Sequence, residues 1–205
     1  MRNAIVVCLL VGLALAGTGA GWAKSEVGVV DWDKVLASFT AYQAALKQHE
    51  DFTAQRQAQL TFRFQTRMLG DAEIKECEEL RKLAAPTEEQ KKRLQELLAV
   101  SDTREQELES LKANASPTPE QSKRIQELQP VSDAGTKALE ELRAKLKQEV
   151  ADEFNRLMTP LDERLKKAIA AVAGELKLGV VLNKGDVLFG GEDITEKVLV
   201  KVNAK

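Results

Sequence analysis

The sequence GVVLNKGDVLFGGEDITEKV at residues 179–198 differs in composition from the chain before it. It contains two short apolar runs, Val180 to Leu182 and Val187 to Phe189, on either side of Asn183-Lys184-Gly185-Asp186. Two β-prone runs around a glycine-containing turn are typical of a β-hairpin. The long segment before them consists mainly of Glu, Lys, Gln, Arg, Leu and Ala. We therefore predict a small β element at the end of a mainly helical protein.

A third strand is predicted near the start of the chain, at Glu26 to Asp31. Three strands bury too little surface to stand alone, and their apolar runs lack polar alternation, so both faces need cover. Self-association through the sheet edges would supply that cover. The residues expected in such an oligomer interface are Val27, Val29, Val30, Val180, Val181, Leu182, Val187, Leu188 and Phe189.

The first residues have the pattern of a secretory signal peptide. Arg2 precedes an apolar run from Ala4 to Ala16, and small residues then lead to Ala23. Cleavage is expected after Ala23, with Ala20 as the second choice. The run is shorter than the roughly 20 residues of a membrane-spanning helix. We predict a soluble mature protein that is exported to the periplasm, with no membrane span.

A long helix is predicted between the first strand and about Leu83. Asp31 or Asp33 can cap this helix, because a 3.6-residue apolar pattern begins at Lys34. No proline interrupts the pattern, and Gly70 is its only glycine. Roughly 50 residues at 1.5 Å each make about 75 Å of helix.

The middle of the chain contains an internal repeat with a period of 31 residues. The copies begin at Pro86 and Pro117, and 15 of their first 26 aligned positions are identical. Each copy opens with Pro-Thr and a Gln three residues after the Thr, which predicts a helix break and a capping box that starts a new helix. A second break in each copy, near Ser101 and Ser132, is left undecided between a kink and a full turn. The chain is expected to reverse at Asn114 to Pro119, the densest cluster of helix breakers.

A continuous apolar pattern from Leu139 to Leu176 predicts a helix that returns along the first one, with a local bend at Pro160. Asp193 and Glu196 then form a capping box before a short final helix. The expected organisation follows from these elements: 1–23 signal peptide; 24–42 first strand and helix start; 43–176 helical arm, with repeat copies 86–116 and 117–147; 177–205 hairpin and C-terminal helix.

Composition and charge exclude several functional classes. Without Arg2, 29 Lys and Arg stand against 32 Asp and Glu, so no basic excess recruits nucleic acid. Aromatic residues make up only 4% of the chain and charged residues 30%, as in coiled coils. Cys77 is the only cysteine of the mature chain and is read as a half-exposed thiol, with an intermolecular disulfide as the alternative.

The sequence gives no set of catalytic residues. His49 is the only histidine and is read as a solvated residue on a helix face. Phosphate loops, nucleophile elbows and Cys/His metal spacings do not occur. Adjacent glutamates such as Glu78-Glu79 point about 100° apart on a helix, so they are read as a solvated surface. We expect no enzyme activity, no metal and no cofactor.

The segment LTFRFQTRML at residues 60–69 is unusually apolar for the arm. Phe62 and Phe64 are two residues apart and point about 200° from each other, so one packed seam cannot bury both. The alternative is that neighbouring helices cover all of the apolar residues here. Arg56, Arg63 and Arg67 can meet acidic segments of a partner or pair with glutamates of the arm. The candidate partner-binding residues are Phe52, Phe62, Phe64, Met68 and Leu69.

The two ends of the chain resemble the Skp/OmpH-like family of periplasmic chaperones. The resemblance lies in the signal peptide, in VGVVDWDKVL at 27–36 and in LGVVLNKGDVLFGGEDITEKVL at 178–199. It implies a homotrimer whose strands close a small β-barrel. Three antiparallel helical-hairpin arms would extend from this barrel and enclose unfolded outer-membrane β-barrel proteins without ATP. The best-known members of the family are strongly basic, whereas this chain is slightly acidic.

Two functions from different classes therefore remain after the sequence analysis. The first is an ATP-independent holdase that prevents aggregation of unfolded outer-membrane proteins through many weak contacts. The second is a structural coiled-coil spacer or adaptor of the cell envelope that binds one folded partner.

Overall fold

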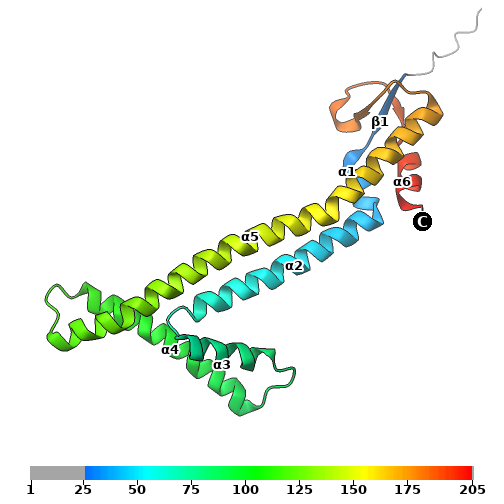
Figure 1. Cartoon of the computed structure of the whole chain (residues 1–205). Helices are drawn as coiled ribbons and strands as arrows, with labels where there is room; N and C mark the ends of the chain where they lie inside the picture. Colours follow the sequence, from blue (N-terminus) through cyan, green and yellow to red (C-terminus); the bar gives the residue numbers. More distant parts are fainter. Residues whose placement is uncertain (1–25, 205) are drawn as a thin grey trace, which may run out of the picture.

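The computed structural model describes residues 26–204, so the predicted signal peptide lies outside the described residues. The chain forms a small body that contains a β-sheet, and a long arm of antiparallel helices extends from it (Figure 1). This arrangement confirms a mainly helical fold with a small three-stranded element. Both ends of the described chain lie at the body.

The sheet has three short strands in the order β2-β1-β3. The central strand β1 (Val27–Val30) is parallel to β2 (Val180–Asn183) and to β3 (Glu192–Asp193). Val29 of β1 lies opposite Leu182 on one side and Asp193 on the other. The whole arm therefore lies between two neighbouring strands, as parallel pairing requires a long crossover.

The predicted β-hairpin is wrong. Val187 to Phe189 forms no strand, and the third strand is Glu192–Asp193 instead. Hairpin strands are antiparallel neighbours, whereas β2 and β3 lie on opposite sides of β1 and point the same way. The segment after the short 3₁₀ turn η1 (Lys184–Asp186) must therefore run back along the sheet before β3 begins. Gly190 and Gly191, with φ of 88° and 94°, make this return possible.

The first helix is broken soon after it begins. Asp31 caps α1 (Trp32–Ser38) by accepting a hydrogen bond from the Lys34 N–H, as predicted. At Phe39 the backbone is extended, and α2 (Thr40–Gln65) begins at the next residue. The side chain of Asn203 accepts from the Thr40 N–H and donates to the Ser38 carbonyl. This long-range partner satisfies the backbone groups at a break that the local sequence did not predict.

The short final helix is confirmed as α6 (Thr195–Asn203), but its predicted capping box does not form. Asp193 Oδ1 accepts from the Thr195 N–H and hydroxyl at 3.0 and 2.6 Å, while Glu196 binds Lys34 across the body. α6 closes the core of the body together with β1, α1 and the end of α5. That core consists of Val30, Val35, Phe39, Leu165, Ala168, Val172, Ile194, Val198, Leu199 and Val202.

The arm is an antiparallel pair of α2 and the 58-residue α5 (Pro119–Leu176) (Figure 1). His49 packs edge-on against Phe154, and Arg56 pairs with Glu149 further along. α5 continues through both Pro130 and Pro160. Each proline removes one intrahelical donor, yet neither ends the helix, so the second break left open by the sequence does not occur in α5.

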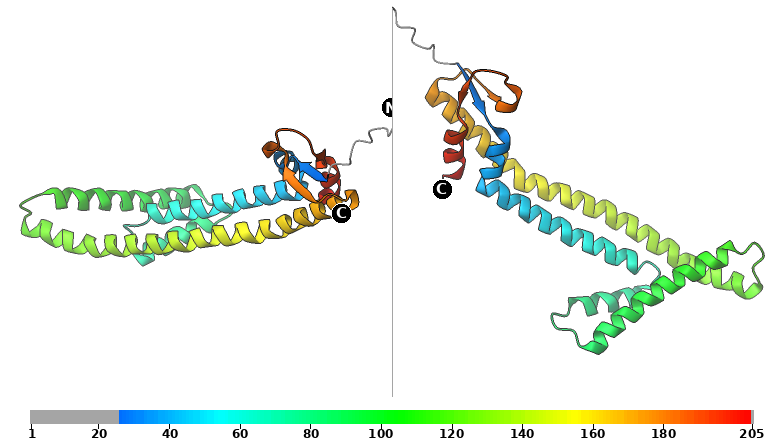
Figure 2. Two further views of the ribbon diagram at one scale, coloured as in Figure 1. Left: turned by 90° about the horizontal axis from the view of Figure 1, so that it is seen from above. Right: turned by 180° about the vertical axis from the view of Figure 1, so that it is seen from behind.

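The prediction of one unbroken helix as far as Leu83 is wrong. α2 ends at Gln65, the chain turns through Thr66 to Gly70, and α3 (Asp71–Lys82) leaves in another direction. Figure 2 shows α3 and α4 (Glu88–Ala113) as a hairpin that projects from the arm. Gly70 precedes α3 and its N–H donates to Glu73.

The helix starts predicted from the repeat are confirmed. Thr87 with Gln90, and Thr118 with Gln121, form complete capping boxes, and each follows a turn. The repeat also gives equivalent contacts: Arg93 pairs with Glu76, and 31 residues later Arg124 pairs with Glu107. The α3–α4 and α4–α5 hairpins are therefore two copies of one unit. The segments 71–82 and 133–144 share seven of twelve residues, which extends the similarity beyond the 26 aligned positions.

Each unit has its own small apolar cluster, and the turn at Thr66 to Gly70 contributes to both. Leu69 packs with Phe62, Cys77 and Leu97 in one cluster. Met68 packs with Leu108 and Leu128 in the other. Cys77 and Leu108 are 31 residues apart, as are Leu97 and Leu128, so the clusters are equivalent.

Candidate functional site

The loop that replaces the predicted hairpin carries two almost fully exposed apolar side chains. Leu188 is fully exposed and Phe189 is 98% exposed, while Val180 and Leu182 on the edge strand β2 are 45% and 43% exposed. We call these four residues the body surface. Large apolar side chains at an unpaired strand edge are typical of a protein interface.

The other residues predicted for the oligomer interface lie deeper. Val29 and Val30 are buried within the body, at 4% and 3% exposure. Val27, Val181 and Val187 are half-buried. The nine predicted residues therefore separate into a buried or half-buried group of five and an exposed group of four that is available to a partner.

Polar contacts fix the loop that carries Leu188 and Phe189. Lys184 Nζ donates to Asp193 Oδ2 at 2.7 Å, and Asn183 donates to Asp186. The hydrogen bond from Lys184, followed by those from the Thr195 hydroxyl and N–H, lowers the pKa of Asp193 to about 2. The ionised Asp193 thereby connects the loop to the start of α6.

A groove runs along the arm between α2 and α5. It consists of two adjoining depressions of about 320 and 200 Å³, and both are lined by Gln57, Leu60 and Arg143. We call this feature the arm groove. Its further lining residues are Thr53, Arg56, Thr61, Phe64, Leu139, Leu146, Lys147 and Val150.

The five residues predicted to bind a partner differ in exposure. Phe62, Met68 and Leu69 are buried, at 8%, 1% and 3% exposure, and hold the helices of the arm together. Phe64 is 51% exposed and lines the arm groove. Phe52 is half-buried, with the Arg56 guanidinium 4.2 Å from its ring centroid. The geometry agrees with the inference that Phe62 and Phe64 cannot share one buried seam.

Leu60, Arg143 and Val150 line the arm groove but were not predicted as binding residues. Pairing the two helices of the arm would have found them, because Gln57, Leu60 and Phe64 lie beside Leu146, Arg143 and Leu139 in the two depressions. The required register depends on where the chain reverses. Because the turn after Gln65 was not predicted, that register could not be derived from the sequence.

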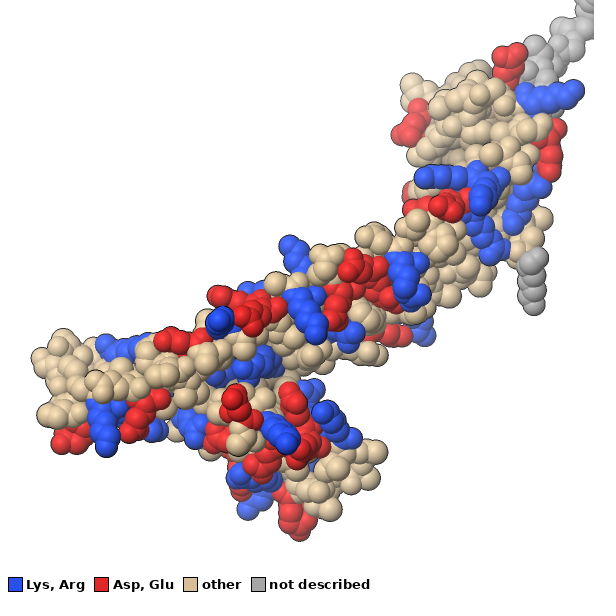
Figure 3. Space-filling model, in the orientation of Figure 1, with Lys and Arg blue, Asp and Glu red and all other residues tan. Residues whose placement is uncertain are grey.

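The arm carries acidic and basic side chains side by side (Figure 3). Several ion pairs connect different elements of the arm: Arg56 of α2 with Glu149 of α5, Arg67 of the turn after α2 with Glu105 of α4, and Arg104 of α4 with Glu73 of α3. The Arg104 guanidinium, helped by the Gly70 N–H, lowers the pKa of Glu73 although partial burial opposes this shift. These pairs indicate that part of the predicted arginine set stabilises the arm.

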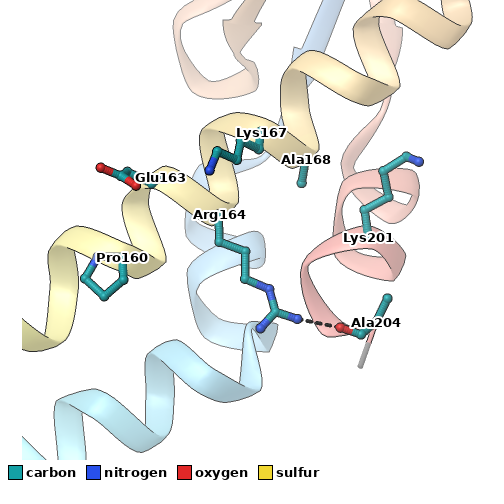
Figure 4. A pocket seen from close by; sticks show the side chains of 7 residues that line it. All are labelled: Pro160, Glu163, Arg164, Lys167, Ala168, Lys201 and Ala204. Atoms are coloured by element: carbon teal, nitrogen blue, oxygen red, sulfur yellow. Dashed lines mark hydrogen bonds between the residues drawn. The ribbon is translucent and has the colours of Figure 1, made fainter.

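A wide depression of about 550 Å³ lies between α5 and α6, where the arm joins the body (Figure 4). Arg164 donates to the Ala204 carbonyl at 2.5 Å, and Lys201 pairs with Glu175. These contacts attach α6 to α5. The depression is therefore explained as a structural joint of the body.

His49 and Cys77, the side chains that could serve catalysis, both pack against apolar or aromatic neighbours. Among residues 26–204, no three potential metal ligands gather into a metal site. His49 is half-buried against Phe154, not solvated as predicted. Cys77 is fully buried instead of half-exposed, because it occupies the core position equivalent to Leu108; burial raises the pKa of its thiol.

None of the helices within residues 26–204 combines the length and the apolar character needed to cross a lipid bilayer.

A small β body and a long arm with mixed charges define an elongated, mainly helical protein. A family model described as "Outer membrane protein (OmpH-like)" matches residues 74–202. This match covers well over half of the chain, so the protein belongs to the OmpH-like family. The matched range includes the stretch 178–199 but begins after 27–36. Searches of curated proteins and of solved structures returned no match.

Proposed function

We propose that the protein is an ATP-independent holdase chaperone of the periplasm that keeps unfolded outer-membrane proteins from aggregating. Membership of the OmpH-like family over residues 74–202 is the observation that carries this proposal. Members of that family are periplasmic chaperones rather than enzymes. The predicted signal peptide would direct the chain to this compartment.

Assembly into a homotrimer is the second part of the proposal. The body surface supports self-association, because Leu188 and Phe189 would bury apolar area against a neighbouring copy, and the number of three copies rests on the resemblance to the Skp/OmpH-like family. The edge strand β2 also presents backbone groups that a second chain can pair with. Assembly would bring several arms to one body and create a space between them for a client.

Many weak contacts suit this role better than one strong site. The arm offers a shallow groove and dispersed charges, so each contact with an unfolded chain stays reversible. Several arms that act on one client raise the local concentration of binding sites and retain the chain without ATP. Binding to the unfolded state also keeps that state from associating with itself.

The direct test dilutes a urea-unfolded outer-membrane β-barrel protein into buffer with the mature chain, residues 24–205, and follows light scattering. We expect suppression near stoichiometric concentration and no effect of added ATP. A scattering curve identical to that of the client alone would contradict the holdase function. Binding to one folded envelope protein, with no effect on unfolded clients of unrelated sequence, would support the spacer or adaptor alternative.

A further inference from the structure

We propose that the arm groove binds short extended client segments that combine apolar side chains with a carboxylate. This proposal rests on the proposed chaperone function and specifies the chemistry of one binding site on each arm.

The floor of the arm groove is apolar. Leu139 and Leu146 are 9% and 5% exposed and form its base, and Leu60 and Val150 are half-buried beside them. Phe64 stands at one end with half of its surface exposed, and the Arg67 guanidinium lies 3.9 Å from its ring centroid. Apolar side chains of a client would bury surface against this floor and against the Phe64 ring.

The length of the arm groove suits a short extended segment. Its lining residues on α2 run from Thr53 to Phe64. Eleven steps at 1.5 Å give about 16 Å. An extended chain advances about 3.3 Å per residue, so the arm groove accommodates about five residues.

The charges at the rim select the polar part of the ligand. The charged residues that line the two depressions are Arg56, Arg143 and Lys147, all cationic. Arg56 is engaged by Glu149 at 2.7 Å. Within residues 26–204, neither Arg143 nor Lys147 forms an ion pair, and both are exposed four residues apart on one face of α5. Although the chain has a formal charge of −2, the rim therefore favours a carboxylate.

The test uses the full mature chain and two fluorescent peptides of about eight residues. Both alternate leucine with a charged residue, aspartate in one and lysine in the other. Fluorescence anisotropy should show tighter binding of the aspartate peptide, by about three- to five-fold for each exposed ion pair gained. Equal affinity of the two peptides would overturn the proposal.

Variants then locate the binding site. Arg143→Glu should remove the preference for the aspartate peptide, and Leu60→Ser should weaken binding of both peptides. Lys166→Glu and Phe154→Ser are the matched controls on α5 outside the arm groove, and they should leave both affinities unchanged. Equal effects of the groove variants and their controls would overturn the proposal.

A photo-crosslinking residue at Gln57 gives a readout that does not depend on the folding of these variants. We expect this residue to label the aspartate peptide, whereas labelling of a second copy of the protein would show that the arm groove is already covered and would overturn the proposal. If the unmodified chain does not suppress aggregation of a client, the chaperone function itself is contradicted. Intact suppression without a charge preference would reject only the groove proposal.

Discussion

At the residue scale, Gly135 of α5 lies directly against the backbone of the turn that follows α2. A β-carbon at position 135 would lie 1.9 Å from the Arg67 carbonyl oxygen, a backbone atom that cannot rotate away. Glycine at this position therefore lets α5 pass beside the turn at Thr66 to Gly70. The sequence shows a glycine inside a helix but does not show what lies next to it.

Gly135→Ala should lower the free energy of unfolding by about 1–3 kcal/mol, the usual cost of forcing extra atoms into a packed site. Gly174→Ala is the matched control in the same helix, because nothing lies within 4 Å of a β-carbon there. The control should raise the free energy of unfolding by about 0.5 kcal/mol through better helix propensity. Urea unfolding at one fixed protein concentration measures both changes, and equal shifts would contradict the close contact.

Asp193 should make stability depend on pH in the acid range. Its pKa is lowered to about 2, so the ionised group stabilises the fold fully above its ordinary pKa near 4. This contribution decreases as pH falls towards 2. Asp193→Asn should therefore lower the urea midpoint at pH 7 and approach the wild-type midpoint as pH falls from about 4 to about 2. A difference that stays constant with pH would show that the ionised carboxylate does not matter.

At the element scale, the turn between α2 and α3 is held by distant partners. The Met68 N–H donates to the buried Ser101 hydroxyl, and Arg104 donates to the Met68 carbonyl. These groups come from the middle of α4. They explain why the α3–α4 hairpin keeps a fixed position beside the arm.

Ser101→Ala should lower the free energy of unfolding by about 1–3 kcal/mol, because it leaves the Met68 N–H buried without an acceptor. Ser132→Ala changes the equivalent residue of the second repeat copy, which is only half-buried, and should shift the free energy by less than about 0.5 kcal/mol. Thermal unfolding monitored by circular dichroism compares the two. Equal melting temperatures of the two variants would contradict the role of the Ser101 hydroxyl in holding the turn.

The elements that sequence predicted correctly depend on local signals. Thr87 and Thr118 sit three residues before glutamines, and both capping boxes form as predicted. The errors occur where distant residues decide. Asn203 stabilises the break at Phe39. Ser101 stabilises the turn after Gln65, and Gly135 leaves room for that turn. The pairing of β3 with β1 excludes a hairpin.

The same difference between local signals and contacts of distant residues applies to the candidate sites. Leu188 and Phe189 were predicted as interface residues; they are exposed and form no strand, and their role in an interface stays a prediction. Helical geometry predicted that one packed seam cannot bury both Phe62 and Phe64, and the structure buries Phe62 and exposes Phe64. The arm groove was not predicted, because its lining depends on the register between two helices more than 70 residues apart in the chain.

At the scale of the whole molecule, the body of one chain leaves apolar side chains exposed to water. Its sheet has an edge at β2, and Leu188 and Phe189, in the loop between β2 and β3, are almost fully exposed. A second copy that covers these side chains would remove apolar area from water. The proposed trimer and the proposed client space both depend on this contact.

The molecular mass of the mature chain in solution, measured by sedimentation equilibrium at micromolar concentration, tests this contact most directly. We predict three times the mass of one chain for the wild type. A double variant with Leu188→Ser and Phe189→Ser should give a smaller species with unchanged helix content. A wild-type protein that sediments as a monomer would contradict the account, as would a double variant that keeps the full trimer mass.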